Sequence, residues 1–198
     1  IGSRLVGSEM CIRDRSYVGE IGFELYTNID ESKKLFLAII KEGKNHGLSL
    51  CGAHAMDIMR MESGFLHWGH DISPEENQYQ AGLKFAISYK KNINFVGKEA
   101  LLKIKDQNPT KSLAMMVLKD NRPGEPLLLH EEPIYLDDKI IGRTTSGNYS
   151  FNFKKNISFG YVNSGNTIEN LVNKNLSIEV EKKKYPVTII KKPLNQKN

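Results

Sequence analysis

The chain has little cysteine and no long apolar run. Its 198 residues contain two cysteines, Cys11 and Cys51. Cys11 falls in an N-terminal stretch without regular pattern, so Cys51 is the one thiol in patterned sequence, and a single thiol cannot close an internal disulfide. We therefore expect a reducing, cytoplasmic setting. Because no run approaches roughly 18 apolar residues, the sequence predicts no transmembrane helix, and we expect no membrane partner.

The usual signatures of nucleotide and zinc sites are also absent. The sequence contains no Gly-x-Gly-x-x-Gly loop, no Walker lysine motif and no Cys-x-x-Cys pair. Its formal charge of +5 is carried mainly by lysines that are scattered over predicted surface positions and are not interleaved with aromatic residues. This pattern argues against a nucleic-acid groove. It favours a solvated lysine-rich surface, with attraction of an anionic ligand as the alternative.

Residues 1–15 show neither helical nor strand periodicity, and they lack the apolar core and cleavage site of a secretory signal. The segment resembles the peptide encoded by read-through of sequencing-adapter DNA, and we interpret it as a non-native leader. The fold prediction therefore starts at Ser16, where patterned sequence begins. Re-amplification of the source gene tests this interpretation, because recovery of the same stretch in frame would contradict it.

The sequence from Ser16 to about residue 109 mixes helical and strand patterns. Phe23 to Tyr26 alternates as a strand does. One helix is expected after Asp30, which can act as its N-cap, and a second between Gly52 and Gly64. The further expected elements are a helical turn opened by the capping box Ser73-Pro74-Glu75-Glu76, a strand over residues 83–89 and a helix over 97–105.

Beyond Asn108-Pro109 the sequence consists of short alternating runs separated by turn residues, which predicts an all-β domain. We place a domain boundary near residue 109 and expect a short tail over 195–198. Hairpin turns are expected at Asp137-Asp138 and at Lys182-Lys183. The predicted strands cover residues 112–118, 133–136, 139–145, 158–162, 176–181 and 185–190.

The segment from Ser16 to Tyr26 places a carboxylate and two phenols around two glycines. If its end is a strand, Glu24 and Tyr26 share one face. The carboxylate of Glu24 can accept two parallel N–H donors, such as those of a planar aminopyrimidinone ring. Tyr17 and Tyr26 can supply aromatic faces and hydroxyls to the same flat ligand. An ordinary half-exposed edge strand is the alternative that these residues leave open.

Two other polar clusters have simpler interpretations. His67-Trp68-Gly69-His70-Asp71 carries three potential metal ligands but lacks the helical i,i+4 spacing that aims two imidazoles at one ion. A hydrogen-bonded turn is therefore favoured over a metal site, and we expect no metal. Asp57, Arg60 and Glu62 are interpreted as a surface or interhelical set of ion pairs.

Several motifs occur in one order along the chain: Ser16–Tyr26, Ala55–Glu62, His67–Asp71, and residues 81–83, 95–101, 144–147, 160–162 and 184–187. In this order they resemble the tetrahydrofolate-binding region of dimethylglycine and sarcosine dehydrogenases. The resemblance covers essentially all of residues 16–194 and extends more loosely to the T-protein of the glycine cleavage system, an aminomethyltransferase. It implies an α+β fold. Residues 16–109 would form the C-terminal part of an aminomethyltransferase-like folate-binding domain, and residues 110–194 a β-barrel or jelly-roll-like domain.

The resemblance also implies folate-binding residues. The glutamate that matches Glu24 grips the pterin ring in those relatives, and the tyrosine that matches Tyr17 lines the folate pocket, in agreement with the interpretation from the residues themselves. Leu25 and Tyr26 continue that wall.

Two further folate positions depart from their relatives. Phe85 stands where dimethylglycine dehydrogenase has a folate-contacting tyrosine, so the ring would remain while a hydroxyl contact is lost. Met56 stands where the T-protein has a folate-contacting arginine. The methionine favours the flavin-dependent demethylases, which the resemblance suggests also carry Ala-Met there.

In these relatives the catalytic aspartate and the flavin domain lie upstream of the region that matches Ser16. We therefore expect this chain to be the C-terminal fragment of a longer enzyme, without a catalytic residue of its own and inactive alone. In the parent that the resemblance implies, FAD oxidises a methylated amine and tetrahydrofolate captures the carbon as methylene-tetrahydrofolate. A stand-alone aminomethyltransferase and a non-catalytic scaffold are the alternatives.

Overall fold

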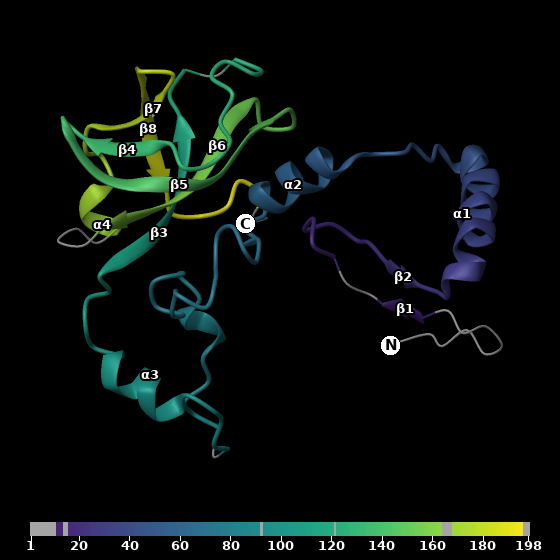
Figure 1. Ribbon diagram of the computed structural model, residues 1–198, viewed down its shortest axis with the longest axis horizontal. Helices are drawn as coiled ribbons and strands as arrows, with labels where there is room; N and C mark the ends of the chain where they lie inside the picture. Colours follow the sequence, from purple (N-terminus) through teal and green to yellow (C-terminus); the bar gives the residue numbers. More distant parts are fainter. Residues whose placement is uncertain (1–10, 14–15, 92, 121, 164–167, 196–198) are drawn as a thin grey trace. The chain divides into compact units, whose positions relative to one another are not determined.

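The computed structural model describes residues 11–13, 16–91, 93–120, 122–163 and 168–195 (Figure 1). The chain divides into two compact units, Ile1–Phe65 and Leu66–Asn198, and each is described by itself. The domain boundary near residue 109 rests on a change of sequence pattern and stays a prediction. The origin of the leader also stays a prediction, and most of residues 1–15 lie outside the described part of the chain.

The first unit contains a two-stranded antiparallel ribbon. β1 (Cys11–Arg13) pairs with β2 (Glu24–Tyr26), and Ile12 lies opposite Leu25. The sequence did not predict β1, because a strand of three residues is too short to show a periodic pattern. The chain bends before β2 at Gly19, whose φ of 74° is a backbone conformation that glycine adopts without strain.

Two helices follow the ribbon. α1 (Ile29–Gly43) has its N-cap at Asn28, so the expected cap at Asp30 was wrong. Asp30 lies instead in the first turn, where its negative charge interacts favourably with the helix dipole. A 3₁₀ turn, η1 (Lys44–His46), extends α1 at its C-terminal end.

α2 (Ala53–Glu62) begins after Gly52, and Gly64 beyond its end has a φ of 74°. Both limits agree with the prediction, since a glycine just past the last turn readily takes the left-handed conformation that ends a helix. None of the helices in the described part of the chain is both long enough and apolar enough to span a membrane.

The second unit opens with irregular chain and two short helices, η2 (Lys84–Ala86) and α3 (Lys98–Ile104). α3 confirms the helix predicted over 97–105, whereas the strand predicted over 83–89 was wrong. The Leu83 N–H donates to the Gln78 carbonyl and the Ala86 N–H to the Leu83 carbonyl, as in turns. Alternation produces a strand only where another strand lies beside it to complete the hydrogen bonds.

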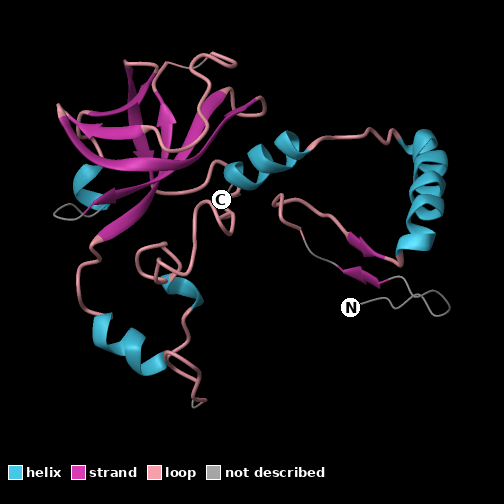
Figure 2. Ribbon diagram, viewed as in Figure 1, coloured by secondary structure: helices cyan, strands magenta, loops and turns pink. Residues whose placement is uncertain are grey.

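Six strands then form a closed antiparallel barrel in the order β3-β6-β5-β4-β7-β8, which Figure 2 shows in magenta. The all-β prediction is confirmed, and the architecture is a barrel. A short helix, α4 (Ile168–Leu171), lies between the fourth and fifth of these strands in sequence. The strands are β3 (Lys111–Leu118), β4 (Pro133–Leu136), β5 (Lys139–Ser150), β6 (Lys155–Asn163), β7 (Leu176–Val180) and β8 (Lys183–Ile190).

The barrel interior is filled by apolar side chains that alternate along the strands. On β3, Ala114, Met116 and Leu118 are buried, and the residues between them are half-buried. This is the two-residue period of a strand with one face in a core. Removal of these side chains from water is the main source of stability of such a core. The other buried members of the cluster are Leu128, Ile134, Ile141, Val162, Leu171, Leu176, Ile178, Val187 and Ile189.

Two hairpins test the predicted turns. Asp137-Asp138 joins β4 to β5 as predicted, since Leu136 pairs with Lys139. The turn between β7 and β8 lies at Glu181-Lys182, one residue earlier than predicted. Both of its residues have positive φ, 50° and 65°, as in a type I′ hairpin turn. Neither is Gly, Asn or Asp, so this turn carries no compositional signal.

β5 changes register between Thr144 and Ser146. Such a bulge inserts an extra residue and reorients the side chains around it. The neighbouring Gly142 is required by close approach of β6, because a Cβ there would lie 1.9 Å from the Tyr161 carbonyl oxygen. The bulge places the Thr145 and Ser146 hydroxyls at the site described next.

Candidate functional site

Glu24 and Tyr26 lie on the same face of β2, as the alternation predicts. The Tyr26 hydroxyl donates a hydrogen bond to Oε2 of Glu24. Glu24 is half-buried, whereas Leu25 and Tyr26 are exposed by 41% and 48%. Since a carboxylate offers about four acceptor positions, one phenol bond orients it and leaves capacity for further donors.

The other predicted folate residues occupy three separate elements. Tyr17 is half-buried in the bend before β2, and the Ser63 hydroxyl donates to the Val18 carbonyl at 3.2 Å, which joins this bend to the end of α2. Met56, in the first turn of α2, is 45% exposed. Phe85, in η2 of the second unit, is 85% exposed. Five of the six residues thus belong to the first unit, and their assignment to folate stays a prediction.

The interpretation of Arg60 as part of a surface ion-pair set was wrong, because its side chain is 1% exposed. Its Nε and Nη2 each lie 2.8 Å from Oδ1 of Asp57, and its Nη1 donates to the Phe65 carbonyl at 3.1 Å. Charge-assisted bonds of this kind are what makes a buried guanidinium tolerable. Arg60 therefore fastens the chain that follows α2 to the last turn of that helix.

His67 to Asp71 forms the hydrogen-bonded turn that its spacing favours. The His67 N–H donates to Oδ2 of Asp71 at 2.9 Å, and the Asp71 residue is fully buried. Oδ1 of Asp71 accepts bonds from the hydroxyls of Thr145 at 2.6 Å and Ser146 at 2.7 Å, while its carbonyl accepts one from Tyr161 at 2.9 Å. Among the described residues, no group of three His, Cys, Asp or Glu side chains could hold a metal ion.

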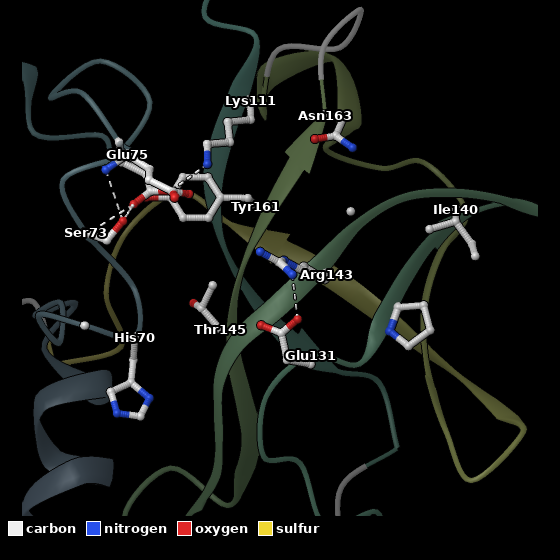
Figure 3. A pocket seen from close by; sticks show the side chains of 14 residues that line it. His70, Ser73, Glu75, Lys111, Glu131, Ile140, Arg143, Thr145, Tyr161 and Asn163 are labelled. Carbon is white, nitrogen blue, oxygen red and sulfur yellow. Dashed lines mark hydrogen bonds and ion pairs between the residues drawn. The ribbon is translucent and has the colours of Figure 1, made fainter.

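A polar cavity of about 590 Å³ opens beside this turn (Figure 3). It contains two ion pairs. Nζ of Lys111 lies 2.5 Å from Oε1 of Glu76, and Nη1 of Arg143 lies 2.8 Å from Oε2 of Glu131. The sequence did not predict this cavity, because its five charged residues come from distant segments and form no linear motif. Its other polar lining residues are His70, Ser73, Glu75, Thr145, Tyr161 and Asn163.

The electrostatics of the cavity fix two protonation states. Burial tends to raise the pKa of Glu76, but hydrogen bonds from Lys111 and Ser73 outweigh it and hold that pKa below the ordinary 4.5. Burial raises the pKa of Tyr161, and the charges of Glu76 and Asp71 raise it further. Glu76 is therefore anionic and Tyr161 a neutral hydroxyl donor near neutral pH.

The comparisons with known proteins agree on one family. Residues 3–91 match the GCVT N-terminal domain, and residues 111–195 match the glycine cleavage T-protein C-terminal barrel domain. The chain is 42% identical over 134 residues to 4-methylaminobutanoate oxidase (formaldehyde-forming) of Paenarthrobacter nicotinovorans, a match that covers 68% of this chain and 16% of that protein. It is 34% identical over 181 residues to mitochondrial dimethylglycine dehydrogenase of Homo sapiens, covering 90% of this chain and 20% of that one.

Two further relatives are aminomethyltransferases. The enzyme of Symbiobacterium thermophilum is 36% identical over 146 residues, which cover 74% of this chain and 38% of that protein. The crystal structure of glycine cleavage system aminomethyltransferase T from Bartonella henselae superposes with a TM-score of 0.80 at 22% identity, over 94% of this chain and 50% of that one. That likeness shows the fold. The chain thus spans a fifth or less of the oxidase and the dehydrogenase and about half of the solved structure. From the domain matches, the chain belongs to the glycine cleavage T-protein family.

Proposed function

We propose that this chain is the tetrahydrofolate-binding part of a flavin-dependent N-demethylase. The observation that carries the proposal is the Glu24 carboxylate held by the Tyr26 hydroxyl on one face of β2. An oriented carboxylate beside an aromatic ring suits the edge of a flat heterocycle with two N–H donors. Two relatives support the demethylase, since their names contain the methylated compounds 4-methylaminobutanoate and dimethylglycine.

Each proposed residue has a role that its chemistry allows. Glu24 accepts bonds from the pterin ring, and Tyr17 and Tyr26 lie along the ring faces. Leu25 and Met56 are partly exposed and supply apolar contact. Tetrahydrofolate, when bound, supplies a nucleophilic nitrogen that accepts a one-carbon unit. The residues of this chain contribute by orienting the folate, which is a proximity effect.

Phe85, the sixth proposed residue, contributes an exposed ring without a hydroxyl. FAD and the methylated amine are assigned to parts of the parent outside residues 1–198. We therefore propose that the chain alone does not oxidise amines, and an amine-oxidation assay on the purified chain that yields a folate-dependent product would contradict this.

A stand-alone aminomethyltransferase is the second candidate, because the relative from Symbiobacterium thermophilum is 36% identical. Met56 argues against it, since the resemblance implies a folate-contacting arginine at this position in the T-protein. The gene sequence upstream of Ser16 discriminates between the two. A dinucleotide-binding glycine fingerprint there selects the demethylase.

Anaerobic calorimetric titration of tetrahydrofolate into the 198-residue chain tests folate binding. We expect a binding isotherm that Glu24→Gln weakens roughly tenfold or more, because a charge-assisted pair becomes a neutral contact. Glu42→Gln is the matched control, since it removes an exposed carboxylate from α1 in the same unit. Absence of heat from the wild-type chain would contradict the proposal and favour a scaffold that has lost its ligand.

A further inference from the structure

The polar cavity of about 590 Å³ lies wholly in the second unit and shares no lining residue with the proposed folate site. Its volume is in the range of small-molecule sites. Figure 3 shows Lys111 and Glu75 in the upper part of the view and Arg143 and Glu131 below them. Charged groups of both signs therefore line one space.

Arg143 supplies most of the free donors. Its side chain is 69% exposed, and its one hydrogen bond within the described part of the chain is from Nη1 to Glu131. A guanidinium has five N–H donors in a planar fork that matches a carboxylate. Exposed ion pairs such as Arg143–Glu131 contribute about 0–1 kcal/mol, so a ligand carboxylate can compete for this fork at little cost.

The carboxylates of Glu75 and Glu76 differ in how many of their acceptor positions are already bonded. Both oxygens of Glu76 are engaged, with Oε1 on Lys111 and Oε2 accepting from both the N–H and the hydroxyl of Ser73. The Glu75 carboxylate makes no hydrogen bond or ion pair to any residue that the structure describes; only its backbone N–H is bonded, to the Ser73 hydroxyl at 3.1 Å. Glu131 already pairs with Arg143 through Oε2, so Glu75 is the lining carboxylate that keeps both oxygens available to a cationic group.

The charge balance selects the ligand class. The lining carries two cations, Lys111 and Arg143, and three carboxylates, Glu75, Glu76 and Glu131. A purely anionic ligand would face the three carboxylates, and a purely cationic ligand would face the two cations. We propose that this cavity binds a small zwitterion with one ammonium and one carboxylate, the chemistry of an amino acid or dipeptide. Its carboxylate binds Arg143 and its ammonium binds Glu75.

A set of probes that differ only in end groups tests the charge requirement. Glycylglycine carries both charges, N-acetylglycylglycine only the carboxylate, glycylglycinamide only the ammonium, and N-acetylglycylglycinamide neither. Titrations of the full chain, followed by NMR chemical shifts of residues that line the cavity, should rank glycylglycine first by about tenfold over either singly charged peptide. A parallel titration with glycine separates the two sources, because an amino-acid site binds glycine as tightly as the dipeptide.

Two variants assign the ends of the ligand. Arg143→Gln should weaken glycylglycine about tenfold and leave glycylglycinamide unchanged, whereas Glu75→Gln should weaken glycylglycine and leave N-acetylglycylglycine unchanged. Arg122→Gln is the control, since Arg122 is similarly exposed and ion-paired with Glu125 but lies outside the cavity lining. Circular dichroism confirms that each variant is folded.

The proposal is overturned by equal affinity for the four probes, by glycylglycine binding that neither variant changes, or by the absence of glycylglycine-induced shifts at the cavity. None of these measurements uses folate, so their failure leaves the proposed folate site untouched.

Discussion

The Thr145 hydroxyl lies 2.6 Å from Oδ1 of Asp71, although 74 residues separate the two in sequence. The next residue, Ser146, donates to the same oxygen at 2.7 Å. Consecutive strand residues normally point to opposite faces, so two hydroxyls on one acceptor require an irregular strand. The register shift of β5 between Thr144 and Ser146 supplies it. The bulge thus fastens the turn at Asp71 to the barrel.

Asp71→Asn should destabilise the second unit by about 1–3 kcal/mol. Asparagine has one carbonyl oxygen, and its amide nitrogen must then face either the His67 N–H or the two hydroxyls, so a buried donor loses its acceptor. Urea unfolding followed by circular dichroism measures the change. Asp120→Asn, at an exposed position, should unfold at the wild-type urea concentration. Equal midpoints for the two variants would show that the Asp71 contacts contribute nothing.

The strands of the barrel were predictable because each carries its own pattern, whereas closure of the sheet into a barrel was not visible in those patterns. Pro133–Leu136 has the limits predicted, and β3 differs by one residue. The prediction ended β5 at Thr145 because the bulge interrupts the alternation there. The strand itself continues to Ser150. The strand predicted over 83–89 failed for the opposite reason, since its alternation has no neighbouring strand to pair with.

The candidate sites also combine features that the sequence predicts with features that depend on tertiary structure. The shared face of Glu24 and Tyr26 follows from local alternation, and a local pattern is visible in sequence. The ties of Asp71 to Thr145 and Ser146 depend on a bulge and on closure of the barrel. The burial of Arg60 depends on the chain after α2 folding back onto it. Neither arrangement leaves a periodic signal.

Acid should weaken the second unit through Glu76. The pKa of Glu76 is lowered in the folded chain, so its contribution to stability is present above its ordinary value of 4.5 and is lost as pH falls through the folded value. Glu76→Gln should therefore reduce the loss of stability between neutral and acidic pH. Thermal unfolding over that range measures it. The adjacent Glu75→Gln, without a side-chain partner among the described residues, should keep the wild-type profile. Identical profiles for all three proteins would contradict the assignment.

Alkaline pH should lower the stability of the second unit through ionisation of Tyr79. Burial and a hydroxyl contact of 2.7 Å with Tyr89 raise the pKa of Tyr79 to about 12. A raised pKa means that the contribution to stability is present below the ordinary value of 10.0 and is lost as pH rises towards 12. Titration of phenolate absorbance should show one late-ionising tyrosine fewer in Tyr79→Phe than in the wild-type chain or in Tyr185→Phe, while Tyr161, whose pKa is also raised, still ionises late in all three. An undiminished late absorbance change in Tyr79→Phe would assign the ionisation to another tyrosine.

Arg60→Lys should loosen the end of α2 although it keeps the charge. Lysine offers one ammonium in place of the fork that contacts both Asp57 and the Phe65 carbonyl, so we expect a loss of about 1–3 kcal/mol. The Phe65 N–H donates to the Arg60 carbonyl at 2.8 Å, and its hydrogen exchange reports on this junction. Exchange at Phe65 should accelerate in Arg60→Lys and stay unchanged in Arg122→Lys, which makes the same replacement at a 70% exposed side chain. Wild-type exchange in Arg60→Lys would mean that the buried fork does not hold the junction, because the local amide would then be protected without it.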